Sequence, residues 1–479
     1  MTSIDVLPDD ILLAIFDYYL VAQDVGRGPS QPFRSGETEQ VEVWQSLVHV
    51  CRRWRIVAFG SPCRLNLRLF CTSKTPARDM LDIWPALPIL VRSRFLTSLE
   101  QKGVDNIVAA LERSDRVREI GLTSRDESAM GKVWAAMQEP FPQLTSLRIE
   151  HRSHGEMATV LTDSFLGGSA ECLRELWLER IPFPGLPKLL LSATHLVDLH
   201  LTDIPHPGYI SPEAMATALS TLTNLESLFL GFQSPQSRLD RESRRPPPLT
   251  RSVLPLLTSL SFKGDNVYID DLVTRIDAPR LNDLVVTFFN DIVFDTPQFV
   301  QFIIRTPGLK ALENAHVYFF GHLRGDTATV SLSSPPSGNG KLEVNVRCKE
   351  LDWQVSSMKQ VCTSCLPPLS TLEGLYLGAP GWRLHRQDNT ENELWLELLH
   401  PFTTVKNLYL TEKIAPRIVP ALQELVGGRV TEVLPTLQNI FLDGLQPSGA
   451  LREGVEKFVA ARQGPIVVSR WERYQDHDD

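Results

Sequence analysis

The residues of this chain that could carry out chemistry are few, and the most specific of them are two cysteines. Cys362 and Cys365 form a C-x-x-C pair, a spacing that suits a metal site or a redox disulfide. A structural zinc site needs a second such pair or nearby histidines, and none stands at a suitable spacing. The sequence therefore favours two ordinary thiols over a zinc or redox role.

The other motifs do not assemble an active site. The glycine pairs at 167–168 and 427–428 lack the lysine and the spacing of a phosphate-binding loop and are typical of helix ends. Neither a G-x-S-x-G nucleophile turn nor an H-E-x-x-H metal helix occurs. The dispersed histidines, such as His195 and His206, are expected on the surface, and the arginines at 238–245 are interpreted as a solvated loop rather than a nucleic-acid contact. We therefore expect no catalytic, cofactor-binding or metal-binding residue, and no enzyme.

In composition the chain is that of a large soluble protein. Its 479 residues are 43% hydrophobic, enough for one elongated repeat array with a small module. A net charge of −9 is mild over this length and argues against nonspecific binding to nucleic acid or membranes. Seven cysteines, an odd number, favour free thiols in a reducing compartment. The apolar stretch from Ile11 to Val21 contains Asp17 and lacks a basic leader, so we expect no membrane span and a cytoplasmic or nuclear location.

Two helices are predicted near the start of the chain. Pro8 suits a first helical turn, and Asp9 and Asp10 complement the positive end of the helix dipole. Apolar residues follow at helical spacing, namely Ile11, Leu12, Ile15, Phe16, Tyr19 and Leu20. Residues 22–40 break the pattern and are predicted to be a flexible insert. A second amphipathic stretch then places Trp44, Leu47, Val48, Cys51 and Trp54 on one face.

These residues resemble an F-box, the trihelical module by which substrate receptors attach to the adaptor subunit of SCF-type ubiquitin ligases. The resemblance covers residues 4–62 and rests on Leu-Pro-Asp-Asp-Ile-Leu at 7–12, Ile-Phe at 15–16 and Val-Cys-Arg-Arg-Trp at 50–54. It implies that Leu7, Pro8, Ile11 and Leu12 face the adaptor and that Val50, Cys51 and Trp54 complete the packed module. The insert is longer than the usual F-box spacer. The simpler alternative is a capped helix start followed by a tryptophan-rich core.

A second signal occupies the rest of the chain. The spacing apolar-x-x-apolar-x-apolar recurs from residue 117 to residue 442, about every 29 residues, near the upper limit of leucine-rich repeats. Clear copies include Leu173, Leu176, Leu178; Leu225, Leu228, Leu230; Val405, Leu408, Leu410. Weaker copies occur at Leu309 with Leu312, and at Leu342 with Val344 and Val346. A unit of one strand and one helix cannot bury its own apolar face, so successive units must stack.

The sequence thus predicts an α/β protein: a trihelical F-box followed by an irregular leucine-rich repeat solenoid, with parallel strands on the concave face and helices outside. The boundaries are 1–62 for the F-box, 63–116 for a linker or irregular first repeats, 117–470 for the solenoid and 471–479 for an acidic tail. The array resembles that of F-box proteins with leucine-rich regions but lacks the usual Asn or Cys position, so no asparagine ladder is expected there. Interruptions are expected at 232–250 and at 331–340, the latter as a mobile loop.

Strand alternation places one residue of each triplet on the open face of the sheet. These residues are Arg148, Trp177, His200, Phe229, Ser261, Val285, Tyr376, Tyr409 and Phe441. Because many are aromatic and acidic residues such as Glu150 and Asp283 flank them, this face is a candidate site for a protein target with basic residues. The alternative is that loops or neighbouring repeats cover the rings.

Three function classes follow. The favoured one is a substrate-recognition subunit of an SCF-type E3 ubiquitin ligase, which binds the adaptor, through it a cullin, and a protein target of unknown identity. The second is a non-catalytic F-box and leucine-rich repeat scaffold without ubiquitin transfer. The third and weakest is an enzyme with an unrecognised site.

Overall fold

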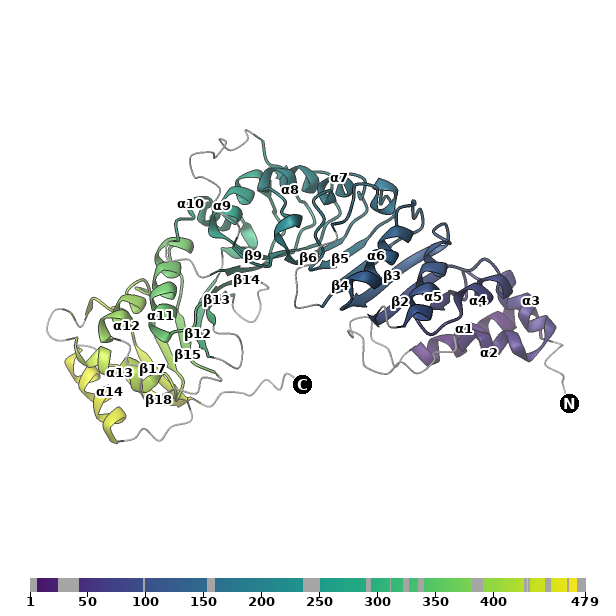
Figure 1. Cartoon of the computed structure of the whole chain (residues 1–479). Helices are drawn as coiled ribbons and strands as arrows, with labels where there is room; N and C mark the ends of the chain where they lie inside the picture. Colours follow the sequence, from purple (N-terminus) through teal and green to yellow (C-terminus); the bar gives the residue numbers. More distant parts are fainter. Residues whose placement is uncertain are drawn as a thin grey trace. The chain divides into compact units, whose positions relative to one another are not determined.

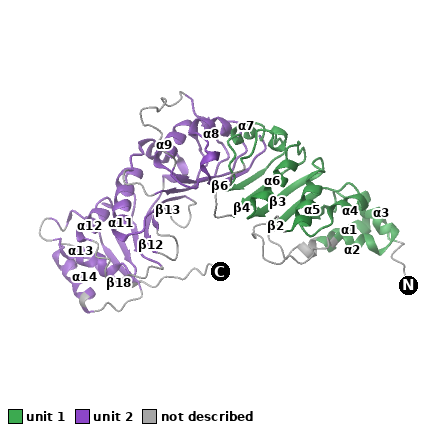
Figure 2. Cartoon of the chain, in the orientation of Figure 1, with its two compact units in different colours: residues 1–193 green, residues 194–479 purple. Residues whose placement is uncertain are grey.

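The computed structural model describes residues 7–24, 43–97, 100–152, 160–235, 250–289, 294–310, 312–321, 327–334, 340–380, 391–425, 429, 431–443, 449–462 and 465–471. The chain forms two compact units, residues 1–193 and 194–479 (Figure 2). No helix among the described residues is long and apolar enough to cross a membrane.

Unit 1 begins with helices and continues as alternating strands and helices. Its main elements are α1 (Asp9–Asp24), α2 (Val43–Val50), α3 (Arg52–Gly60), β1 (Leu69–Cys71), α4 (Ala77–Ile83), β2 (Ile89–Leu96), α5 (Gln101–Leu111), β3 (Val117–Ser124), α6 (Glu127–Ala136), β4 (Ser146–His151), β5 (Glu175–Glu179) and α7 (Leu186–Leu190). Strands β1 to β5 are parallel and follow one another in chain order.

Helices α1, α2 and α3 pack around a small core of their own. Phe16 is fully buried, and its ring lies 4.8 Å from that of Trp54. Cys51 caps the N-terminus of α3, where its Sγ accepts a hydrogen bond from the Trp54 backbone N–H at 3.4 Å. Trp44 donates to the Arg68 carbonyl oxygen at 3.0 Å, a bond that ties α2 to the segment before β1.

Unit 2 contains the larger part of the array. Its main elements are β6 (Asp198–Ile204), α8 (Pro212–Leu219), β7 (Ser227–Phe232), β8 (Ser252–Val253), β9 (Ser259–Gly264), α9 (Asn266–Arg275), β10 (Ile276–Asp277), β11 (Asp283–Phe288), α10 (Pro297–Arg305), β12 (Asn314–Phe320), β13 (Thr327–Ser333), β14 (Lys341–Arg347), α11 (Leu351–Gln360), β15 (Gly374–Gly378), α12 (Asn392–Leu399), β16 (Asn407–Leu410), α13 (Ala415–Gln423), β17 (Asn439–Asp443), α14 (Gly449–Ala461) and β18 (Val467–Trp471).

Along most strands, buried side chains alternate with more exposed ones, which separates the two faces of the sheet. The triplet leucines Leu176, Leu228 and Leu408 are buried, as their repeat positions predict. In unit 2 this buried face meets the helices, and Phe319 of β12 packs edge-on against Trp395 of α12 at 5.5 Å. Figure 1 shows α8, α9 and α10, and likewise α11, α12 and α13, on one side of the strands they accompany. The prediction of a repeating α/β array with leucines inside is therefore confirmed.

The sheet of unit 2 is not wholly parallel, and here the sequence-based prediction is wrong. Its order is β6-β7-β9-β11-β14-β13-β12-β15-β16-β17-β18, and β13 is antiparallel to both β12 and β14. The serine-rich segment predicted as a loop begins within β13, because Ser331, Leu332 and Ser333 pair with both neighbouring strands. Residues 335–339 of that segment, and 236–249 of the other predicted interruption, lie outside the described residues.

Threonine hydroxyl groups link successive repeats of the array. Thr371, Thr404 and Thr436 each precede the first apolar residue of a triplet. Their hydroxyls donate to the carbonyl oxygens of Leu312, Leu372 and Val405, the corresponding positions of the preceding repeat, at 3.0, 2.9 and 3.0 Å. These bonds satisfy backbone acceptors at the turn that leads into each strand.

Candidate functional site

The helices of the N-terminal module expose a stripe of apolar side chains. Ile11, Ile15, Tyr18 and Tyr19 are exposed, and their spacing puts them on a stripe of α1 next to the one that holds the buried Leu12 and Phe16. Tyr18 is 78% exposed. Val50 at the end of α2 and Ile56 on α3 are also exposed. Exposed apolar clusters on a soluble protein commonly mark a surface that another protein covers.

The structure corrects two of the roles that the resemblance implied. Leu12 is fully buried, so it belongs to the core of the module and does not face a partner. Val50 is 58% exposed, so it does not complete the packed module. Helical periodicity identified the apolar positions of α1, but it could not decide which of two adjacent apolar stripes faces inward, because that choice depends on where α2 and α3 pack.

Leu7 and Pro8 lie at the start of α1, which is held against α3. Arg53 pairs with Asp9 at 2.7 Å and donates a second hydrogen bond to the Leu7 carbonyl oxygen. Pro8 is exposed and Leu7 is half-buried. The exposed stripe on α1 is therefore presented by a helix whose first turn is fixed by contacts to α3.

On the open face of unit 1, the predicted residues Arg148 and Trp177 form a cation–π pair. The Arg148 guanidinium lies 4.1 Å from the centroid of the Trp177 ring on the neighbouring strand. Glu150 is only 3% exposed and receives Arg148 at 2.7 Å and Arg152 at 2.9 Å. Glu150 is thus engaged within the chain, which contradicts its predicted role as an acidic group offered to a basic partner.

The open face of unit 2 begins with a second predicted pair. His200 of β6 and Phe229 of β7 are in register and nearly parallel, with ring centroids 6.2 Å apart. The next two strands place Ser261 and Val285 in the same row. Asp283, beside Val285, accepts a hydrogen bond from the Ser259 hydroxyl at 3.2 Å. These predicted residues therefore form one continuous row across the strands, although their side chains range from aromatic to polar and aliphatic.

A continuous ring stack occupies the later strands of unit 2. His316, Tyr376, Tyr409 and Phe441 stand in register on β12, β15, β16 and β17. Their ring centroids are 4.3, 4.0 and 4.5 Å apart and their planes are within 10° of parallel. We call these four residues the ring ladder. Burial and a hydrogen bond with Tyr409 raise the pKa of Tyr376, so the Tyr376 phenol remains neutral at physiological pH.

The ring ladder exposes a different surface to solvent from the separate aromatic side chains that the sequence predicts. Because the rings stack along the direction from strand to strand, the faces between neighbouring rings are covered and the surface above the stack consists of ring edges and polar ring atoms. The three predicted residues Tyr376, Tyr409 and Phe441 are thus brought together, but not as separate anchors. His316 was missed, although the alternation of Ala315, Val317 and Phe319 with polar residues is a strand signal that would have located it.

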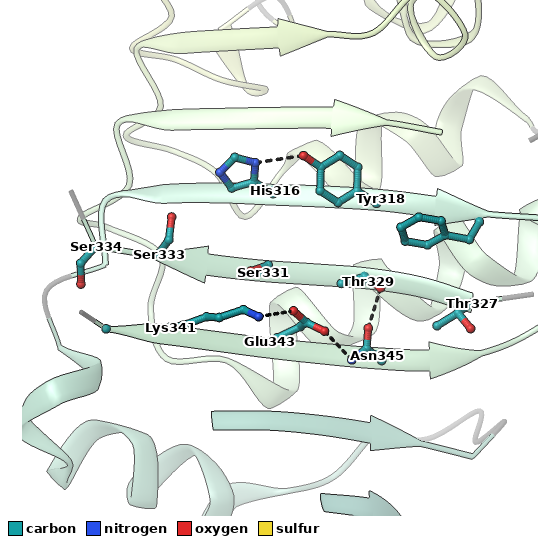
Figure 3. Close-up of a pocket in the computed structure, with 12 residues that line it drawn as sticks. His316, Tyr318, Thr327, Thr329, Ser331, Ser333, Ser334, Lys341, Glu343 and Asn345 are labelled. Carbon is teal, nitrogen blue, oxygen red and sulfur yellow. Dashed lines mark hydrogen bonds and ion pairs between the residues drawn. The ribbon is translucent and has the colours of Figure 1, made fainter. Parts of the chain in front are cut away.

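Beside the ring ladder lies an open depression of about 740 Å³ above β13 (Figure 3). Its floor is made of the small hydroxyl side chains of β13, its first wall of side chains from β12 and its second wall of side chains from β14. The residues are Thr327, Thr329, Ser331 and Ser333 on the floor, His316, Tyr318 and Phe320 on the first wall, and Lys341, Glu343 and Asn345 on the second. The depression exists because β13 carries short side chains between two strands with long ones.

A hydrogen-bonded chain fixes the β14 wall of this depression. Lys341 pairs with Glu343 at 3.0 Å, and Asn345 donates to Glu343 at 2.9 Å. The Thr329 hydroxyl in turn donates to the Asn345 side-chain oxygen at 2.6 Å. Tyr318 on the opposite wall lies over Gly378, where a Cβ atom would come within 3.0 Å of its ring. The walls are thus positioned by contacts within the chain.

Cys362 and Cys365 are buried on a single π-helical turn after α11. Burial raises the pKa of each thiol to about 12, which disfavours the reactive thiolate form. Among the described residues, no cluster of histidine, cysteine and carboxylate side chains has a metal-binding arrangement. Both side chains contribute to the buried core next to α10.

Comparisons with known proteins give little information about the function of these surfaces. No family model matches the sequence, and no curated protein matches it. Among solved structures, the chain is similar to the leucine-rich repeat-containing protein LegL7 from Legionella pneumophila, with 12% identity over 83% of this chain and 99% of that chain and a TM-score of 0.27. A likeness this distant carries no functional argument, so function has to be inferred from the surfaces described above.

Proposed function

We propose that this protein is the substrate-recognition subunit of an SCF-type E3 ubiquitin ligase. Helices α1–α3 would bind the adaptor subunit and through it a cullin, and the open face of the repeats would bind a protein target. Holding the target near a ubiquitin-charged enzyme would raise the effective concentration of its lysines, so the chain itself needs no catalytic residue. Seven cysteines without disulfide partners suit the reducing cytoplasm or nucleus, where we place it.

The observation that carries this proposal is the exposed apolar stripe on α1. Its residues Ile11 and Ile15 lie in the segment that resembles an F-box, next to a helix start anchored by Arg53. A protein that kept this module only for its own stability would have no reason to leave several large apolar side chains in water on one helix face. A partner that covers the stripe accounts for both the sequence motif and its exposure.

The experiment is copurification of adaptor and cullin with the tagged full-length chain. We expect Ile11→Asp with Ile15→Asp to remove both partners, because a buried interface cannot accept two unpaired carboxylates, while the fold survives since both positions are exposed. Ile83→Asp is the matched control, because Ile83 is 74% exposed on α4 of the same unit. Adaptor capture that persists in the double variant would refute the assignment.

The same experiment separates the alternative function. A scaffold would retain the adaptor but carry no cullin, and an unrelated protein would carry neither under mild conditions. Ubiquitin transfer to a captured target, assayed with the complete ligase, then distinguishes a working receptor from a complex that only assembles.

A further inference from the structure

The ring ladder stops at β13 because of one residue. Along the central row of the open face, His316 is in register with Ser331 of β13, and Ser331 is in register with Glu343 of β14. The row therefore reads ring, ring, ring, ring, serine, carboxylate from β17 to β14. At the other end, Phe441 is in register with Ser469 of β18. The stack of four rings is thus bounded by a serine on each side.

The position above Ser331 has the dimensions of one more ring. His316 stacks on Tyr376 with an interplanar angle of 7°, so its opposite face is directed toward β13, where it lines the depression. Two strand spacings, about 10 Å, separate the rows of β12 and β14 at this point. A flat ring over Ser331 would meet His316 at a contact distance of about 3.5–4.0 Å and still leave space for the Glu343 side chain.

The surroundings favour an uncharged ring with a polar tip. The β14 wall carries one positive and one negative group, Lys341 and Glu343, which pair with each other. A charged ligand would therefore meet no net opposite charge. The floor around Ser331 consists of hydroxyls, which an apolar ring tip would separate from water without replacing their hydrogen bonds. A phenol satisfies both conditions, because its ring continues the stack and its hydroxyl can donate to or accept from the floor.

From these observations we propose that the depression over β13 binds a tyrosine side chain of the target protein, on an extended segment that crosses the open face, as a fifth ring of the ladder. This inference rests on the target-binding half of the proposed function and names the chemistry of that target. Tyrosine is expected to bind more tightly than phenylalanine, which lacks the hydroxyl, and much more tightly than leucine, which cannot stack.

The test uses the purified full-length chain and a displayed library of random 12-residue peptides. Selected peptides are synthesised and their affinities measured for three proteins: wild type, Ser331→Tyr and Ser469→Tyr. The first variant fills the proposed site with the chain's own ring. The second adds the same ring at the other end of the ladder, beyond Phe441, and leaves the depression unchanged, so it controls for folding and for added aromatic surface.

We expect recovered peptides to share a tyrosine, to bind Ser469→Tyr like wild type, and to bind Ser331→Tyr at least tenfold more weakly. Replacing the shared tyrosine by alanine should cost at least tenfold, and by phenylalanine a few-fold. Equal binding to wild type and Ser331→Tyr overturns the proposal, as does a recovered set of peptides without a shared aromatic residue. The adaptor takes no part in this measurement, so its outcome is independent of the copurification experiment.

Discussion

The open face of unit 1 and the later strands of unit 2 carry different kinds of side chains at the same repeat positions. In unit 1 the row residue Arg148 pairs with a buried carboxylate, Glu150, which also pairs with Arg152, and the Arg148 guanidinium lies over the Trp177 ring. In unit 2 the equivalent positions hold the ring ladder, which contains no carboxylate, lysine or arginine. The repeat therefore fixes which way a side chain points but not which side chain it is. Each group of strands can thus acquire its own binding specificity.

The largest loss of stability that would test this comparison is expected from a substitution in the ring ladder. Tyr409→Ala removes the ring that stacks on Tyr376 and on Phe441, and two aromatic pairs are worth about 1–3 kcal/mol beyond the area they bury. Hydrogen exchange of β15–β17 should accelerate accordingly. Tyr409→Phe keeps both stacks and loses only a hydrogen bond with Tyr376, so its effect should be smaller. Equal effects of the two variants would mean that the stack contributes nothing.

A smaller effect is expected in the charged cluster of unit 1. Glu150→Gln removes the charge that holds Arg148 and Arg152, at a cost of about 1–2 kcal/mol, because both arginines can still reach water. The measurement is the free energy of unfolding of unit 1 at low and high salt. Glu119→Gln is the control, since its pair with Arg92 is more exposed and worth less than about 1 kcal/mol. If the control costs as much, Glu150 is not the centre of the cluster.

The smallest effect concerns pH and sharpens the difference between the units. Burial lowers the pKa of His151 below 6.5, and its Nδ1 has no hydrogen-bond partner among the described residues. Below pH 6.5 the unfolded chain therefore binds a proton that the folded chain resists, so unit 1 loses stability as the pH falls. His151→Gln should reduce the loss of protection in β4 between pH 7.5 and pH 5.5, measured as hydrogen-exchange protection factors, which divide out the slowing of intrinsic amide exchange at lower pH. An unchanged pH dependence would exclude His151 as its source.

The sequence predicts those features that depend on local periodicity. Triplet leucines such as Leu228 and Leu408 are inside, and Tyr376 and Tyr409 lie on the open face, because alternation along a strand is a local property. The stack itself, and the membership of His316, could not be predicted in the same way. They depend on β12 pairing with β15 rather than with β11, which is a choice between distant segments.

The predictions for the N-terminal helix and for the serine-rich segment were wrong for related reasons. Leu12 and Ile11 are adjacent and both apolar, and only the position of α2 and α3 decides which one is buried. Ser331 and Ser333 have a loop-like composition, yet they form a strand because β12 and β14 offer backbone partners on both sides. Residue type is a weak guide where the environment supplies all the hydrogen bonds.

The reversal at β12–β14 also has a consequence for biosynthesis. In a regular array each new repeat covers the strand before it as soon as it leaves the ribosome, so assembly proceeds by nearest neighbours. Here β11 pairs with β14, and the chain must first produce α10, β12 and β13 before that partner exists. During this delay the nascent protein displays an unpaired strand edge that invites misassociation. Translation through this stretch is therefore the step at which help from a chaperone would matter most.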